Sequence, residues 1–208
     1  MKIESRTYRL TGITPLLGSQ AANPAVRTEY LASKAPSPAQ VLEEENMIPT
    51  ATADERGLTV FMRSPGDETI CIMDYALVGF FKGACKALGA SNGIKQSDSK
   101  VGTYVFVEPR VIPIRRGREP VMETDGVLER PLRAQTMQGP RVTLTSSEKV
   151  ELPWQMIITV KLIENEGTAK SKPVTWDALE EALDYGRLKG LGQWRNGGWG
   201  RFEWERVG

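Results

Sequence analysis

The sequence predicts an α+β fold in which two helices cover one face of an antiparallel sheet. The 208 residues, 40% of them hydrophobic and 25% charged, are typical of a globular protein that can bury a core. Two segments have the amphipathic spacing of helices, residues 75–88 and 176–185. Four segments have the alternation or the β-propensity of strands, residues 7–14, 102–114, 154–163 and 199–206.

The first strand precedes a long insertion. Residues 7–14 alternate between polar and apolar side chains, and Pro15 ends the strand. Residues 19–57 are rich in Ala, Pro, Ser and acidic residues and show no sustained hydrophobic period, which predicts an insertion. Residues 38–45 favour a short helix within it, and we interpret the adjacent glutamates at 43–45 as a solvated face.

A hairpin and the first helix follow. Residues 58–63 and 69–72 flank a segment rich in Pro, Gly and acidic residues, which predicts a β-hairpin. The helix over 75–88 has one apolar stripe. We expect Asp74 to cap its start and Gly89 to end it in the left-handed conformation.

The second half contains another insertion between two strands. Residues 102–114 and 154–163 have high β-propensity, and the polar, arginine-rich segment 115–150 between them is interpreted as the insertion. Thr175 is expected to cap the helix over 176–185, and the last strand follows the glycine-rich segment.

Without the insertions, the order of elements is β-α-β-β-α-β, which predicts a ferredoxin-like (split βαβ, RRM-like) fold. We expect one domain over residues 1–208, with insertions at about 19–57 and 115–150. In this fold both helices lie on one face of a four-stranded sheet, and the other face is free. A larger mixed sheet that includes the 58–72 hairpin is the alternative.

The composition excludes several classes of function. The chain has no histidine, which removes the commonest general base and the usual transition-metal ligand. Cys71 and Cys85 lie in apolar surroundings and are interpreted as buried thiols, because their spacing indicates neither a disulfide nor a metal site. We predict no catalytic residue, no metal and no cofactor. No segment approaches the roughly 20 apolar residues that span a bilayer, so we expect a cytoplasmic protein.

The segment 190–201 carries the strongest functional signal. It contains five glycines, two tryptophans and two arginines, after a helix and before a strand. Glycine permits close approach, arginine offers a donor fork to phosphate, and tryptophan offers a stacking surface. The order helix, loop, strand excludes Rossmann and P-loop sites, in which the loop precedes a helix. The alternative is a tight turn whose tryptophans fill a gap in the core.

Four segments resemble the RAMP superfamily, the ferredoxin-like subunits of CRISPR ribonucleoproteins. These are Leu-Thr-Gly-Ile-Thr-Pro-Leu-Leu-Gly-Ser at 10–19, the helix with Lys-Gly-Ala at 73–87, the strand at 154–163 with its following helix, and the glycine-rich loop at 190–202. The resemblance implies the fold and contact with RNA. The chain is shorter than most backbone subunits and lacks the histidine that many RNA-cleaving members use. Its compact form also resembles proteins carried by phages and prophages.

The candidate nucleic-acid-binding residues come from the glycine-rich loop and from basic side chains elsewhere. The two helix lysines are equally interpreted as a solvated face, and the arginines of the second insertion as partners of its own acidic residues. The candidates are Lys82, Lys86, Arg115, Arg116, Arg118, Arg133, Arg141, Lys189, Trp194, Arg195, Gly197, Gly198, Trp199, Gly200 and Arg201. We expect the amides of the three glycines to meet phosphate.

We therefore expect a non-enzymatic protein that binds single-stranded RNA or a related polynucleotide. The net charge of only +1 argues against wholesale electrostatic capture of nucleic acid, although residues 110–141 hold seven arginines and no lysine. The alternative is a protein-interaction or assembly module, such as a phage antagonist of a host CRISPR or signalling defence complex, with a protein partner or a second copy of this chain. A metal-independent ribonuclease is the third hypothesis.

Overall fold

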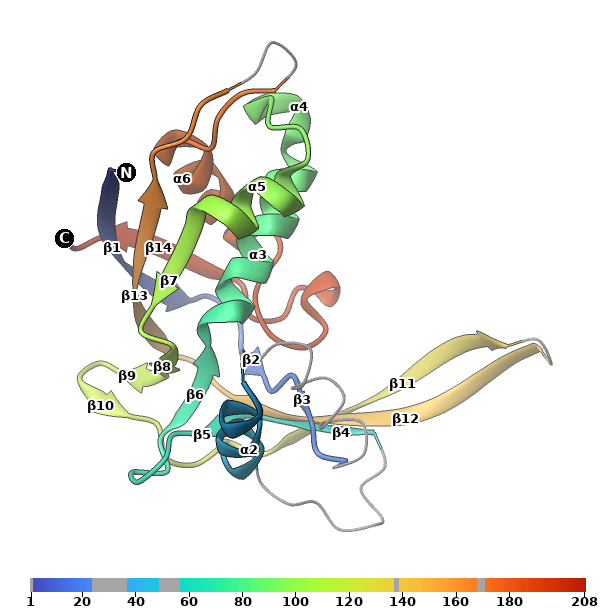
Figure 1. The fold of residues 1–208 in the computed structure, drawn as a ribbon. Coiled ribbons are helices and arrows are strands. Elements are labelled where there is room, and N and C mark those ends of the chain that lie inside the picture. Colours follow the sequence, from blue (N-terminus) through green and yellow to red (C-terminus); the bar gives the residue numbers. More distant parts are fainter. Residues whose placement is uncertain (1, 24–36, 49–56, 137–138, 168–170) are drawn as a thin grey trace.

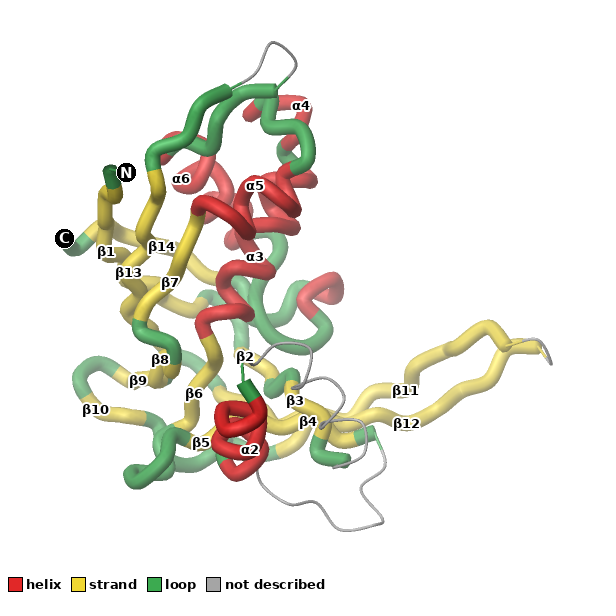
Figure 2. Tube along the Cα trace, viewed as in Figure 1, coloured by secondary structure: helices red, strands yellow, loops and turns green. Residues whose placement is uncertain are grey.

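The protein has an α+β fold built from antiparallel-rich sheets and a few helices (Figure 1; Figure 2). The computed structural model describes residues 2–23, 37–48, 57–136, 139–167 and 171–208. The helices are α2 (Pro38–Asn46), α3 (Asp74–Ala87), α4 (Gly89–Asn92), α5 (Ser97–Tyr104) and α6 (Trp176–Asp184), with 3₁₀ turns η1 (Tyr185–Arg187) and η2 (Arg195–Gly197).

The main sheet contains the first, third and last predicted strands and part of the second. Its core order is β14-β1-β13-β7, and every neighbouring pair is antiparallel. A short hairpin, β9-β10, extends this sheet beside β13 through the pair Gln155↔Arg115. The bounds are β1 (Ile3–Gly12), β7 (Val105–Glu108), β9 (Arg115–Arg116), β10 (Glu119–Pro120), β13 (Gln155–Ile163) and β14 (Phe202–Arg206).

Helices α3 and α6 cover one face of the main sheet. Alternate residues of β1 and β13 are buried, among them Leu10 and its register partner Met156. They belong to the same apolar cluster as Phe81 of α3 and Leu183 of α6. Because strand side chains alternate between faces, the intervening residues lie on the opposite face, where Ile157 is 45% exposed. The sheet therefore has one covered and one open face.

Two smaller sheets lie beyond the main one. In the first, β12 pairs with β11, β4 and β2, and β4 pairs with β3. Its two long strands, β11 and β12, project from the body as an arm (Figure 1). The other sheet has the order β5-β6-β8. The bounds are β2 (Leu16–Leu17), β3 (Gln20–Ala21), β4 (Leu58–Val60), β5 (Met62–Arg63), β6 (Ile70–Met73), β8 (Val111–Pro113), β11 (Val127–Thr136) and β12 (Gly139–Val150).

The predicted strand over 102–114 begins too early, and it is two strands, not one. Residues 102–104 belong to α5, and the extended run breaks after Glu108. Pro109 has no amide hydrogen for the ladder, so the chain leaves the main sheet there. It resumes as β8, which pairs with β6 in the smallest sheet.

The hairpin prediction is only partly right, and the larger mixed sheet is wrong. Met62 and Arg63 pair with β6, but residues 58–60 pair instead with β3 and β12. The segment 58–63 is thus divided between two sheets, and neither part joins the main one. The last strand also begins later than predicted, at Phe202, because residues 198–200 belong to the preceding turn.

The predicted caps of α3 are also corrected, whereas the cap of α6 is confirmed. Met73 is the N-cap of α3, and Asp74 is its first residue, with Oδ1 accepting from the Tyr75 amide at 2.8 Å. The left-handed glycine after α3 is Gly93 (φ 69°), which ends the short α4. Thr175 Oγ1 accepts from the Ala178 amide at the start of α6.

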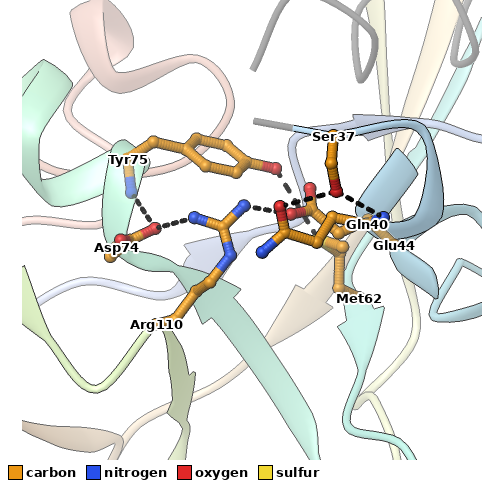
Figure 3. A network of polar contacts seen from close by, with 7 residues as sticks. All are labelled: Ser37, Gln40, Glu44, Met62, Asp74, Tyr75 and Arg110. Carbon is orange, nitrogen blue, oxygen red and sulfur yellow. Dashed lines mark hydrogen bonds and ion pairs between the residues drawn. The ribbon is translucent and has the colours of Figure 1, made fainter. Parts of the chain in front are cut away.

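The predicted short helix in the first insertion forms as α2, but one of its glutamates is buried. Glu44 is 3% exposed and ion-pairs with Arg110, whose Nη1 also donates to Asp74 Oδ1 at 3.3 Å (Figure 3). Burial raises the pKa of Asp74, and the Arg110 charge opposes that rise. Glu44 is therefore an anchor that fixes α2 to the start of α3.

Candidate nucleic-acid interface

The glycine-rich loop 190–201 is held against the segment that follows β1. The amide of Gly200 donates to the Pro15 carbonyl at 2.8 Å, and the amide of Gln193 donates to the Leu17 carbonyl at 3.2 Å. Across the loop, the Leu191 amide donates to the Gly200 carbonyl at 2.9 Å. These backbone bonds fix the path of the loop at both of its ends.

Three glycines are required here because backbone lies where a Cβ would stand. A Cβ on Gly190 would lie 2.1 Å from the Gly200 carbonyl carbon, and one on Gly200 would lie 2.1 Å from the Leu191 oxygen. A Cβ on Gly192 would lie 2.3 Å from the Leu17 oxygen. Gly192 and Gly200 also have positive φ, at 74° and 66°, which side chains disfavour. The glycines permit tight packing of the loop.

The amides that we expected to meet phosphate are already engaged. The Gly197 amide donates to the Trp194 carbonyl at 2.7 Å, and the Gly198 amide donates to the Arg195 carbonyl at 3.2 Å. The Gly200 amide is bonded to Pro15, as described above. The expected amide contacts are therefore corrected, because an anion would have to break these bonds. Any recognition by this loop falls to its side chains.

Neither tryptophan of the loop is a core residue. Trp154 fills that role: it is fully buried, and its Nε1 donates to the Thr14 carbonyl at 2.8 Å. Trp194 and Trp199 are only partly buried. The interpretation of the loop as a turn whose tryptophans fill a core gap is therefore wrong for both, although the turn itself is tight.

Trp194 stacks with an arginine from the arm. Its backbone is left-handed (φ 50°), and the Cζ of Arg130 lies 5.4 Å from its ring centroid. This geometry is a cation–π contact. In the part of the chain that the structure describes, the buried Nε1 of Trp194 donates no hydrogen bond. Arg130, in β11, was absent from the candidates because the sequence does not show which arginine of the second insertion reaches the loop.

The two arginines of the loop differ in their surroundings. Arg195 is exposed and makes no ion pair with any residue of the described ranges. Arg201 is fixed by its backbone, since its amide donates to Thr14 Oγ1 at 2.8 Å and Thr14 Oγ1 donates to the Gly198 carbonyl. Its Nε is buried and has no hydrogen-bond partner among the described residues. We define the loop–arm surface as Arg130, Trp194, Arg195, Trp199 and Arg201.

The helix lysines lie away from this surface. Lys86 Nζ ion-pairs with Asp98 of α5 at 3.2 Å. Lys82 Nζ lies 2.8 Å from the position that a Cβ on Gly102 of α5 would take. Both lysines therefore face α5. Lys189 follows α6, where its amide donates to the Tyr185 carbonyl.

The predicted arginines of the second insertion also lie elsewhere. Arg115, Arg116 and Arg118 belong to the β9-β10 hairpin beside the main sheet, and Arg116 ion-pairs with Asp125. Arg133 and Arg141 lie in the arm, opposite Val142 and Ala134 respectively, and their side chains lie outside the described part. The prediction that insertion arginines pair with nearby acids therefore holds for Arg116.

The two cysteines are free and buried, as predicted. Burial raises the pKa of Cys71 to about 12 and that of Cys85 to about 11. Among the described residues, no three His, Cys, Asp or Glu side chains lie together as metal ligands. None of the helices in the described ranges combines the length and the apolar character needed to cross a bilayer.

No protein-family model and no curated protein matches the chain. Among solved structures, it is similar to a chain in a cryo-EM structure of the Type III-B Cmr-beta bound to cognate target RNA, with a TM-score of 0.47 and 9% sequence identity. The similarity covers 100% of this chain and 60% of that chain, so this protein spans about three fifths of its neighbour's length.

Proposed function

We propose that this chain is a single-domain, ferredoxin-like and RAMP-like protein that binds single-stranded RNA, without catalysis, through the loop–arm surface. The main support for this proposal is the Arg130–Trp194 stack, because it brings a guanidinium group of the arm next to the aromatic side chains of the loop. An exposed Arg195 and a partly exposed Trp199 lie on the same loop.

The strand order supports the proposed fold. When the four strands are numbered by their order in the chain, the sheet order β14-β1-β13-β7 reads 4-1-3-2, and all neighbouring pairs are antiparallel. Helix α3 lies between the first two of these strands in the chain, and α6 lies between the last two. A split βαβ fold has this order, with both helices on one face.

The chemistry of the surface suits a single strand. Base stacking on tryptophan contributes about 1–3 kcal/mol per base and tolerates any sequence. Guanidinium groups form paired, charge-assisted hydrogen bonds to phosphate. Since the loop's amides are engaged, we assign phosphate contact to Arg195 and Arg130, and base stacking to Trp199. The packed backbone fixes the positions from which the side chains of the loop project before RNA arrives, which reduces the entropy lost on binding.

A fluorescence anisotropy titration with a labelled oligouridylate tests this proposal. For single strands, log K falls with log salt with a slope of about −0.7 per neutralised phosphate. Arg195→Gln should weaken binding and reduce the slope by about 0.7, if one phosphate contact is lost. Arg187→Gln is the matched control, because Arg187 is an exposed arginine of η1 outside the loop–arm surface. A folded protein that does not bind at low salt contradicts the proposal.

The arm also favours a second function, a protein-interaction or assembly module, such as a phage antagonist of a host CRISPR or signalling complex. On the arm, Leu144 is 66% exposed and Val127 is 53% exposed, and exposed apolar side chains on a projecting hairpin suit contact with another protein. Light scattering after size exclusion, and co-purification from a host lysate, test it. A monomer without any protein partner contradicts this second function.

A further inference from the structure

A separate cavity of about 560 Å³ lies where the open face of the main sheet meets the β9-β10 hairpin. Its wall contains Arg9 of β1, Gln155 and Ile157 of β13, Pro113 of β8, Arg115 of β9 and Arg118 of the following turn. None of these residues belongs to the loop–arm surface. A cavity of this size lies within the range of small-ligand sites, roughly 300–1,000 Å³.

The charged side chains that line this cavity are all positive. Three arginines line it and no acidic residue does. Arg9 ion-pairs with Glu205 at 2.5 Å, and that pair is exposed. In the described ranges, neither Arg115 nor Arg118 makes an ion pair. Two guanidinium charges are therefore available to an anion in the cavity, and a third is shared with Glu205.

The hairpin orients its arginines by its own backbone. Gly117 has a positive φ of 64°, which closes the tight turn between β9 and β10. Arg115 Nη1 donates to the Arg118 carbonyl at 3.1 Å, so the two residues are held together. Arg116, between them in the chain, ion-pairs instead with Asp125 outside the cavity wall. Among the residues that the structure describes, Arg116 alone of the hairpin arginines has an acidic partner, and it is not part of the wall.

One wall of the cavity is apolar and exposed. Ile157 lies opposite Arg9 in the sheet register, on the open face, and is 45% exposed. Pro113 provides a rigid apolar surface nearby, and the Gln155 amide adds a donor and an acceptor. A ligand that suits this wall and the arginines has a flat apolar part and an anionic part at once.

We propose that this cavity binds a nucleoside phosphate, with the phosphate on Arg115 and Arg118 and the base against Ile157. Guanidinium forks form paired hydrogen bonds to the oxygens of a phosphate. The apolar wall at Ile157 and Pro113 favours an anion that also carries a ring. The ligand is a free mononucleotide or the 5′-phosphorylated end of a strand, since both present the same chemistry. This site is independent of the proposed RNA surface.

Isothermal titration calorimetry of the full chain at low salt with adenosine monophosphate, and separately with inorganic phosphate, tests this site. We expect saturable binding of the nucleotide and weaker binding of phosphate. Arg118→Ala should weaken both by about tenfold or more, as for loss of a charged hydrogen bond. It is an exposed residue whose carbonyl remains for Arg115. Ile157→Ala should weaken the binding of the nucleotide but not of inorganic phosphate, because it removes the apolar surface for the base.

Matched controls separate this site from the loop–arm surface. Arg206→Ala removes an exposed arginine of the same sheet outside the cavity and should change nothing. Arg195→Gln should leave nucleotide binding intact even where it weakens RNA binding. Competition by a 5′-phosphorylated but not a 5′-hydroxyl dinucleotide identifies a strand end as the ligand, and competition by neither identifies the free nucleotide. Absence of nucleotide binding by the folded protein, or equal binding by wild type and Arg118→Ala, overturns the proposal.

Discussion

Substitution of Gly200 by alanine tests whether the glycine-rich loop is a packed structure. Gly200 has a φ of 66°, and an added Cβ would lie 2.1 Å from the Leu191 oxygen and 3.0 Å from a methyl group of Leu16. Substitutions at two other glycines of the loop separate the cost of the left-handed backbone from the cost of the close contact. Gly198 has a φ of 85°, but the nearest atom to an added Cβ is 3.9 Å away. A Cβ on Gly197 would lie 3.0 Å from the end of the Arg130 side chain and 3.6 Å from the Trp199 ring, which is ordinary contact.

The expected losses of stability follow from these contacts. The left-handed conformation costs an alanine roughly 1–2 kcal/mol, which is the whole expected effect at Gly198. The overlap with backbone at Gly200 adds about 1–3 kcal/mol, as for other overpacked sites. We therefore expect about 2–5 kcal/mol for Gly200→Ala, about 1–2 kcal/mol for Gly198→Ala, and within about 0.5 kcal/mol for Gly197→Ala.

Thermal unfolding followed by calorimetry measures this series. For a chain of 150–250 residues, each kcal/mol lowers Tm by about 2–4 °C, so Gly200→Ala should lower it by about 4–20 °C. Gly198→Ala should lower Tm by about 2–8 °C. The reasoning is refuted if Gly200→Ala unfolds at the same temperature as Gly198→Ala, since the close backbone contact would then contribute nothing.

Other predictions concern the RNA surface, the thiols and the α2 anchor. Trp199→Ala should weaken oligouridylate binding by about 5- to 150-fold, the equivalent of one stacked base, in the anisotropy titration. Because burial raises the pKa values of Cys71 and Cys85, the protonated thiols favour the folded state. This contribution to stability is complete below the ordinary thiol pKa of 9.0 and is lost as pH rises through 11 to 12. A thiol reagent at pH 8 should therefore label only unfolded protein. Arg110→Ala should cost about 3 kcal/mol in urea unfolding, because it leaves the Glu44 carboxylate buried without its partner; an unchanged midpoint contradicts the anchor.

Much of the main sheet could be predicted from sequence because its signals are local. Periodicity located both helices within a residue of their observed ends, and in the strand over 154–163 every second residue from Met156 to Leu162 is buried. The division of residues 58–63 between two sheets could not be predicted, since each half has the same β-propensity and only distant partners distinguish them.

The candidate site was predicted in composition but not in geometry. The sequence shows that glycine, tryptophan and arginine interleave, yet it does not show whether loop amides bond to their own chain or stay open. It also does not show that Arg130 reaches Trp194, a contact between residues 64 positions apart in the sequence. Burial of Glu44 was missed for the same reason, because its partner Arg110 comes from another part of the fold.

Photo-cross-linking of a uridine-rich RNA, with the attachment site located by mass spectrometry, tests RNA recognition by the loop–arm surface most directly. We predict adducts on the peptide that contains Trp194, Trp199 and their neighbours. These adducts should be lost in Trp199→Ala, and they should also be lost from the wild type when salt displaces the RNA. Saturable RNA binding with every adduct outside residues 190–201 and the arm would contradict the account.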